Sequence, residues 1–283
     1  MHLLILLSGL GVSWGLRYFW TVDTSADWSE RWQQGLKGLL FAPLLMLTSA
    51  IAVIWMGPQG QMVWLWEGWL SYVLAIGFLS LAAVCWLHLI WQGQRTLQQI
   101  RAYPQTELLG RSVRVLDLAM PYSAQVGFWQ PELVVSQGLL DKLDYPHLEA
   151  VLLHEQAHHY YRDTFWFFWL GWARRLTAWL PQSDSVWQEL LVLRELRADR
   201  WVAEQTDALL LAEALLLVVS TPPILDQNIC AAFSSVAPPS RLMQRIEALF
   251  TDAAPQRHLQ TNLWSWGWLL LVWLPLLSIP FHS

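Results

Sequence analysis

Long uncharged stretches alternate with a polar middle along this chain. Four stretches reach or approach the ~20 apolar residues that an α-helix needs to cross a bilayer at about 1.5 Å per residue. They cover residues 1–20, 39–57, 69–92 and 262–281, and Pro275 is expected to kink the last one. The pattern predicts a mainly α-helical membrane protein with four transmembrane helices. The first stretch lacks a basic leader and a small-residue cleavage site, so we expect it to stay as an anchor.

The positive charges of the short loops predict the orientation. Arg31 and Lys37 lie between the first two stretches, the next loop has no Lys or Arg, and Arg95 and Arg101 follow the third. Since Lys and Arg collect on the cytoplasmic side, the polar middle is expected in the cytoplasm and both termini outside. This predicts an integral protein of the bacterial inner (plasma) membrane. The apolar segment 165–180 is too short for a span, and we expect it to lie in the interface or to pack on the spans.

The polar middle, residues 103–260, shows the pattern of a small α+β domain. Alternating residues predict strands at 112–118, 122–128 and 132–136, and we expect them to form a short antiparallel sheet. Helical patterns follow, after a short helical turn at 138–143. These helices are expected at 146–161, 186–204, 208–220 and 241–250.

Composition excludes several classes of function. The chain is 55% hydrophobic and 14% charged, against about a quarter charged in soluble domains, and its net charge of −5 gives no reason to expect nucleic acid as a partner. The two cysteines, Cys85 and Cys230, are too few for a zinc-thiolate site. Many of the 21 tryptophans lie at the ends of the apolar stretches, as interfacial indoles do.

One short motif carries metal chemistry. His154-Glu155-Gln156-Ala157-His158 matches the pattern H-E-x-x-H on a predicted helix. Residues four apart share a helix face, so both imidazoles can bind one Zn²⁺ ion. Glu155 is rotated about 100° from His154, so it can reach a water activated by the metal and act as the catalytic base. The alternative is an ordinary polar face on an amphipathic helix.

A catalytic zinc takes three protein ligands and keeps one open position. Glu195 is the best candidate for the third ligand. Asp199 lies one helical turn later and is expected to accept a hydrogen bond from the far nitrogen of a ligand histidine, with His154 as the favoured partner. His159 and Glu189 are weaker candidates for the third ligand, and a solvated charged helix face is the alternative for Glu195 and Asp199.

The same residues resemble a known family. The runs GFWQPELVVSQGLLDKLDYPHLEAVLLHEQAHHYYRD, RELRAD and SRLMQRIEAL are similar to the BlaR/MecR-type membrane metallopeptidases over about residues 113–249. The resemblance implies a zincin-like (gluzincin) domain, one zinc ion at His154, His158 and Glu195, and cytoplasmic peptide cleavage with Glu155 as base. It also implies that the strand before the helix binds substrate by β-augmentation.

Two features depart from that family. Tyr145 stands where the family has a Ser or Thr helix cap, and the chain ends at Ser283, so we expect a stand-alone member without the penicillin-binding sensor domain. The expected function is a membrane-anchored zinc endopeptidase that cleaves a cytosolic or membrane-proximal protein, such as a transcriptional repressor. The alternatives are a quality-control metallopeptidase of the prenyl-protein or heat-shock type, and a non-catalytic membrane signalling protein. The expected partners are a protein or peptide substrate and the lipid bilayer.

Overall fold

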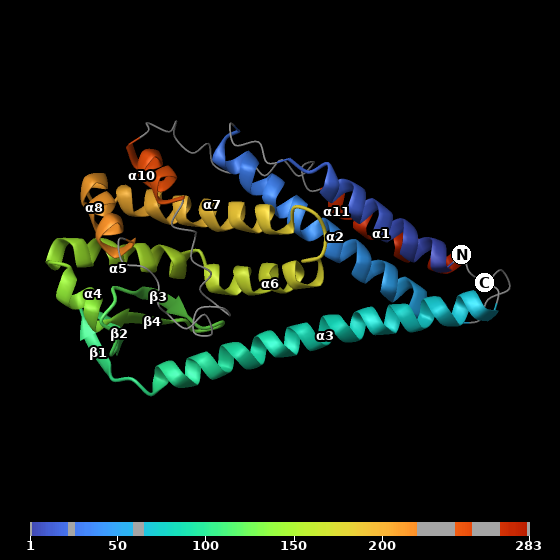
Figure 1. The fold of residues 1–283 in the computed structure, drawn as a ribbon, viewed down its shortest axis with the longest axis horizontal. Helices are drawn as coiled ribbons and strands as arrows, with labels where there is room; N and C mark the ends of the chain where they lie inside the picture. The colour runs from blue at the N-terminus through green and yellow to red at the C-terminus, as the bar shows by residue number, and fades with distance from the viewer. Residues whose placement is uncertain (1, 22–25, 59–64, 220–240, 251–266, 282–283) are drawn as a thin grey trace. The chain divides into compact units, whose positions relative to one another are not determined.

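The structure is a computed structural model that describes residues 2–21, 26–58, 65–219, 241–250 and 267–281. It is mainly helical with one small sheet, as the sequence predicts (Figure 1). The elements are α1 (His2–Tyr18), α2 (Trp28–Met56), α3 (Leu65–Arg101), β1 (Gln105–Leu108), β2 (Arg111–Leu116), β3 (Ser123–Val126), β4 (Glu132–Ser136), α4 (Gln137–Lys142), α5 (Tyr145–Tyr160), α6 (Asp163–Leu176), α7 (Ser183–Ala203), α8 (Ala208–Val219), α10 (Leu242–Phe250), α11 (Trp268–Val272), α12 (Leu274–Leu277) and the 3₁₀-helix η3 (Ile279–Phe281).

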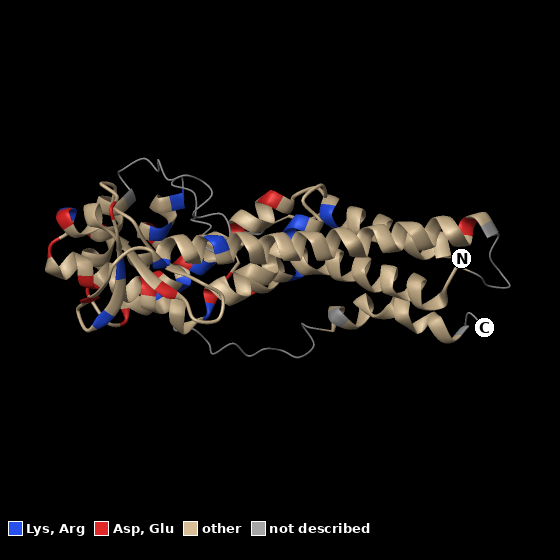
Figure 2. Cartoon of the chain, turned by 90° about the horizontal axis from the view of Figure 1, so that it is seen from below, with Lys and Arg blue, Asp and Glu red and all other residues tan. Residues whose placement is uncertain are grey.

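The chain divides into two compact units. Unit 1 comprises Met1–His88, Leu170–Leu190 and Gln256–Ser283, and unit 2 comprises Leu89–Trp169 and Leu191–Pro255. Figure 2 shows that charged side chains are frequent on the elements of unit 2, whereas the long apolar part of α3 carries almost none.

Within the described residues, two helices are long and apolar enough to cross a membrane, Trp28–Met56 and Trp66–Arg101. Both extend beyond the apolar stretches that predicted them, because the helices continue into polar residues. The first predicted span forms α1, a shorter helix of 17 residues. The fourth breaks into α11, α12 and η3 from residue 268 onward, with Pro275 in the first turn of α12, and its residues 262–266 lie outside the described residues.

The segment expected at the membrane interface or against the spans forms α6, which ends at Leu176. One face of α6 is buried, while Trp166 on the other face is 58% exposed. In unit 1, the indole nitrogen of Trp172 donates a hydrogen bond to the carbonyl of Ala82 on α3, over 2.9 Å. The segment therefore packs against one of the two helices that are long and apolar enough to cross a membrane.

Unit 2 contains a four-stranded sheet with the order β1-β2-β4-β3. The predicted antiparallel sheet is wrong in one respect: β2 and β4 pair in parallel, with Val113 opposite Leu133, so the sheet is mixed. β3 and β4 form an antiparallel hairpin that turns at Gly127. β4 then pairs with β2 on its other side and runs in the same direction as β2. β3 therefore lies at an edge of the sheet and β4 in its middle.

The core of unit 2 lies between this sheet and α5. Apolar residues of β2 and β4 pack against one side of α5, where Leu148, Val151 and Leu152 are buried. The first turn of α4 packs closely on the backbone before β3 at Gly138, whose added Cβ would lie 2.1 Å from the carbonyl oxygen of Ala119. Only glycine fits such a close approach of two backbones. This packing fixes α5, and the functional residues on it, against the sheet.

Candidate metal centre

The helix that carries the motif begins and ends sharply. Asp144 caps α5, accepting a hydrogen bond from the backbone nitrogen of His147 over 3.2 Å. The cap is thus supplied one residue before Tyr145, where the resemblance places it, and Pro146 occupies the first turn. At the other end Arg162 adopts a left-handed conformation (φ 53°), and α6 begins at the next residue, Asp163.

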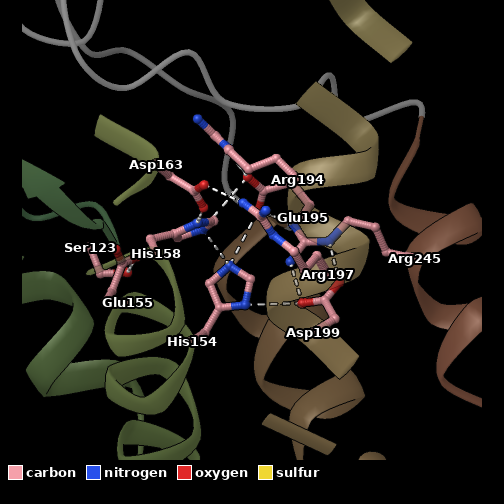
Figure 3. Close-up of polar contacts among 10 residues, drawn as sticks. All are labelled: Ser123, His154, Glu155, His158, Asp163, Arg194, Glu195, Arg197, Asp199 and Arg245. Carbon is pink, nitrogen blue, oxygen red and sulfur yellow. Dashed lines mark hydrogen bonds and ion pairs between the residues drawn. The ribbon is translucent and has the colours of Figure 1, made fainter. Parts of the chain in front are cut away.

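Three predicted ligands converge in unit 2, and all three are buried (Figure 3). Nε2 of His154 lies 3.1 Å from Nε2 of His158 and 3.2 Å from Oε2 of Glu195, which projects from α7. Nε2 of His158 lies 3.7 Å from Oε1 of Glu195. One ligand atom from each residue falls within 4.8 Å of the others, so the cluster could hold a metal ion.

The spacing of these atoms fits a tetrahedral metal. With bonds of about 2.0–2.2 Å and tetrahedral angles, neighbouring ligand atoms are separated by roughly 3.3 Å. The separations of 3.1 to 3.7 Å between the imidazole nitrogens and the Glu195 carboxylate bracket this value. Two imidazole nitrogens that face one another cannot both carry a hydrogen at this distance, whereas two lone pairs directed at one cation can approach in this way. Imidazole with carboxylate is also a donor set that zinc uses.

Each histidine is held from behind by a carboxylate. Nδ1 of His154 lies 3.0 Å from Oδ1 of Asp199, and Nδ1 of His158 lies 2.8 Å from Oδ2 of Asp163. Both carboxylates are at most 3% exposed. A carboxylate at Nδ1 favours the tautomer with hydrogen on that nitrogen, which leaves Nε2 free to bind a metal. Sequence reasoning expected Asp199 behind His154, and it missed Asp163.

Three arginines surround the carboxylates. Arg194 donates to Oε1 of Glu195 from Nε (3.0 Å) and a terminal nitrogen (2.6 Å), and Arg245 on α10 lies 3.3 Å from Oε2. Arg245 also binds Asp199 through two hydrogen bonds of 2.7 Å each. The two guanidinium groups fix the Glu195 carboxylate in place.

Arg197 forms an ion pair with Asp163 and lies over the ring of Tyr161, 4.1 Å from its centre. The carboxylates of the site belong to Glu155, Asp163, Glu195 and Asp199, and its guanidinium groups to Arg194, Arg197 and Arg245 (Figure 3). With both imidazoles neutral it therefore has one negative charge in excess, which suits a divalent cation.

The metal-free cluster attracts protons strongly. Burial lowers the pKa of His154, and the carboxylates of Asp199 and Glu195 raise it to about 9. Burial also opposes the charge of His158, but Glu195 and Asp163 raise its pKa above the usual value. Burial alone would raise the pKa of Glu195, yet Arg194 and the other cations hold it well below its usual range. The carboxylates of Glu195, Asp199 and Asp163 thus favour their ionised form, and this negative charge would stabilise a cation held by the imidazoles.

Glu155 lies beside the cluster and points elsewhere. Its Oε1 accepts a hydrogen bond of 2.8 Å from the hydroxyl of Ser123, at the start of the edge strand β3. Glu155, Ser123 and the three predicted ligands line one cavity of about 140 Å³. A carboxylate at the wall of a metal cavity, next to a strand edge, is well placed to exchange protons with a molecule bound there.

The structure therefore brings His154, His158, Glu195, Asp199 and Glu155 together. The two weaker candidates for the third ligand lie elsewhere: His159 is exposed, and Glu189 forms a buried ion pair with Arg31 in unit 1. No protein family and no curated protein matches this sequence.

Proposed function

We propose that this chain is a membrane-anchored, zinc-dependent endopeptidase. The observation that carries the proposal is the buried convergence of His154, His158 and Glu195, with Glu155 on the wall of the same cavity. Three protein ligands, two of them histidines with carboxylates behind them, are typical of catalytic zinc sites rather than structural ones, which use four. This is also the set that the resemblance to BlaR/MecR-type metallopeptidases implies.

The residues of the chain divide the work. His154, His158 and Glu195 would hold the zinc ion, which supplies the Lewis acidity that activates a water molecule and a peptide carbonyl. Glu155 takes the proton of the attacking water and passes it to the nitrogen of the leaving amine. The Ser123 hydroxyl orients the Glu155 carboxylate through its hydrogen bond. Asp163 and Asp199 keep the two imidazoles in the metal-binding tautomer.

The edge strand β3 offers a binding surface for an extended substrate. Among the described strands β3 pairs only with β4, so its outer edge has no strand partner there and is the edge at which another strand would add. β3 also carries Ser123, the partner of Glu155. The strand expected to bind substrate, which directly precedes the helices, is β4, and it is paired on both sides. We therefore assign β-augmentation to β3.

The anchoring part of the proposal rests on the apolar helices of the chain. Two of them are long enough to span a bilayer, and we propose that α1 and the α11–α12 segment add two further spans. The Lys and Arg pattern of the loops favours the cytoplasmic side for the metal cavity. The substrate is then a cytosolic or membrane-proximal protein, and a transcriptional repressor is the case that the resemblance favours.

The proposal is tested with Glu155→Ala in the purified full-length protein. Removing a general acid–base group costs about 10²–10⁴ in rate, so cleavage of an unfolded reporter protein should fall at least ~100-fold. The zinc content by elemental analysis should stay at one per chain, since Glu155 is not a ligand. The control is Glu149→Ala, an exposed glutamate on the same helix, which should cleave like the wild type.

Two results would contradict the proposal. Unchanged cleavage by Glu155→Ala would remove the assignment of the base. A wild-type protein that holds one zinc ion but cleaves no unfolded protein would favour the non-catalytic alternative.

A further inference from the structure

A second cluster of polar groups lies in unit 1, far along the chain from the metal ligands. Arg17, in the last turn of α1, is only 2% exposed, and none of its three guanidinium nitrogens has a hydrogen-bond partner in the part of the chain that the structure describes. A guanidinium group stays charged at neutral pH. A buried charge without a partner is strongly unfavourable, and the weak dipole of a helix end offsets little of it. Arg17 therefore needs an anion.

The described residues around the cavity beside Arg17 supply hydrogen-bond donors and no carboxylate. It has a volume of about 240 Å³, and its polar lining includes Ser13, Trp20 and Lys37. Neither the hydroxyl of Ser13 nor the indole nitrogen of Trp20 has a partner among the described residues. Among the residues that the structure describes, no Asp or Glu lines the cavity. Several donors around one space, two of them cationic, form a site for an anion.

The same cavity has an apolar side, formed by residues that include Phe41 and Leu271. The polar wall is built tightly: a Cβ added to Gly38 would lie 2.6 Å from the ring of Trp20. The indole thus packs directly on the backbone of α2, which holds its nitrogen at the cavity. A wall of donors beside an apolar wall fits an amphipathic anion better than a free inorganic one.

The position of these residues along the apolar stretches indicates which anion. Arg17 and Trp20 end the first stretch (1–20), and Lys37 directly precedes the second (39–57). Trp268, which also lines the cavity, belongs to the start of the fourth stretch (262–281). In the proposed topology all these ends lie at the cytoplasmic membrane surface. Lipid phosphates lie at this level, and the cytoplasmic leaflet is rich in anionic lipids.

We propose that the cavity around Arg17 binds the phosphate of an anionic phospholipid, with the acyl chains along its apolar side. The inference rests on the membrane insertion proposed above and not on the zinc chemistry. Arg17 and Lys37 neutralise the phosphate, Ser13 and Trp20 donate hydrogen bonds to it, and α1, α2 and α11 are joined through one lipid.

The test compares Arg17→Gln with the wild type, both full-length, in nanodiscs of phosphatidylcholine with and without phosphatidylglycerol. Phosphatidylglycerol should raise the midpoint of thermal unfolding of the wild type, while that of Arg17→Gln should not respond. In phosphatidylcholine alone, Arg17→Gln should be at least as stable as the wild type, because it lacks the unpaired charge. Native mass spectrometry should show phosphatidylglycerol binding weakened at least tenfold. The control Arg95→Gln removes an exposed arginine of α3 and should respond like the wild type.

Equal responses of wild type and Arg17→Gln to phosphatidylglycerol, or no response of the wild type, would overturn the proposal. Inorganic phosphate is the second probe: if it stabilises the wild type in phosphatidylcholine and phosphatidylglycerol does not, the ligand is free phosphate. If Arg17→Gln does not fold, Lys37→Gln and Ser13→Ala replace it, and unchanged responses in both refute the site. Glu155→Ala should show the wild-type lipid response. The proposed lipid site and the proposed peptidase activity are therefore tested independently of each other.

Discussion

Replacing Asp163 by asparagine tests the part played by the buried carboxylate that holds His158 and pairs with Arg197. Asparagine has nearly the same shape and keeps one oxygen that can accept a hydrogen bond, but it removes the charge. A hydrogen bond to a charged group contributes about 1.5–3 kcal/mol and one between neutral groups about 0.5–1.5 kcal/mol. The 2.8 Å contact is buried, so the full difference of ~1–1.5 kcal/mol applies to it.

At 1.4 kcal/mol per factor of ten, this difference corresponds to a zinc affinity weakened about five- to tenfold. Loss of such outer partners weakens metal affinity about 10–100-fold, so a tenfold change is the central expectation. The affinity is measured on the purified full-length protein by competition with a chromophoric chelator at fixed pH.

The matched control is Asp144→Asn. Asp144 also contacts Nδ1 of a histidine, His147, but it is exposed, and it caps α5. Asparagine caps a helix as well as aspartate does, so α5 and its ligands should be unaffected. Wild-type zinc affinity in Asp163→Asn, or an equal loss in both variants, would refute the reasoning that the buried carboxylate orients the ligand.

Two further predictions concern protons and packing. Burial lowers the pKa of His154, but the two neighbouring carboxylates raise it to about 9, so protons compete with zinc for this imidazole. The apparent zinc affinity should therefore rise about tenfold per pH unit between pH 6.5 and 9. A flat pH profile in chelator competition would contradict this. The folding stability of the metal-free protein has the opposite pH dependence. Protonated His154 stabilises the fold fully below about pH 6.5, and this contribution is lost as the pH rises past 9. Gly138→Ala should lower the free energy of unfolding by about 1–3 kcal/mol, because the new Cβ meets the carbonyl of Ala119. The control Gly77→Ala, whose Cβ would have nothing within 4 Å, should leave it unchanged. Equal denaturation midpoints of the two variants would refute the clash.

Local helical geometry was sufficient to predict part of the site. His154 and His158 are four residues apart, as are Glu195 and Asp199, and such pairs share a helix face wherever the helix packs. Asp163 could not be found in this way, because the left-handed residue Arg162 ends one helix and redirects the chain before the carboxylate. An Asp just after the helix, five residues from His158, was the available signal.

In the sequence, Arg245 was recognised only as part of the run SRLMQRIEAL, and no role was predicted for it. It lies 46 residues after Asp199, and no local rule connects them. The available signal was weak: Arg245 lies on a short amphipathic helix that also carries Gln244 and Glu247, and nothing in that pattern shows that it is buried. Contacts of this kind depend on how α10 packs against α7, which the pattern of one helix does not contain.

The sheet shows the same limit. The strands of alternating residues were found, but β1 (Gln105–Leu108) is mostly exposed and polar, so it has no alternation to detect. Strand order depends on non-local pairing, and the parallel pair β2–β4 joins strands that are not neighbours in sequence. Apolar stretches likewise predicted where helices lie, but not how far α2 and α3 continue into polar sequence.

Under the proposed function, the edge position of β3 sets a requirement on a substrate that binds there. A segment that adds to this strand must be extended and must have its own backbone hydrogen bonds unmade, so a residue within a native helix or sheet cannot bind until it opens. Where opening and closing are fast, the cleavage rate is then proportional to the fraction of substrate molecules that are locally unfolded. The proposed peptidase would thereby discriminate between proteins by the stability of their segments as well as by their sequence. A ligand that holds a substrate folded would then protect it from cleavage.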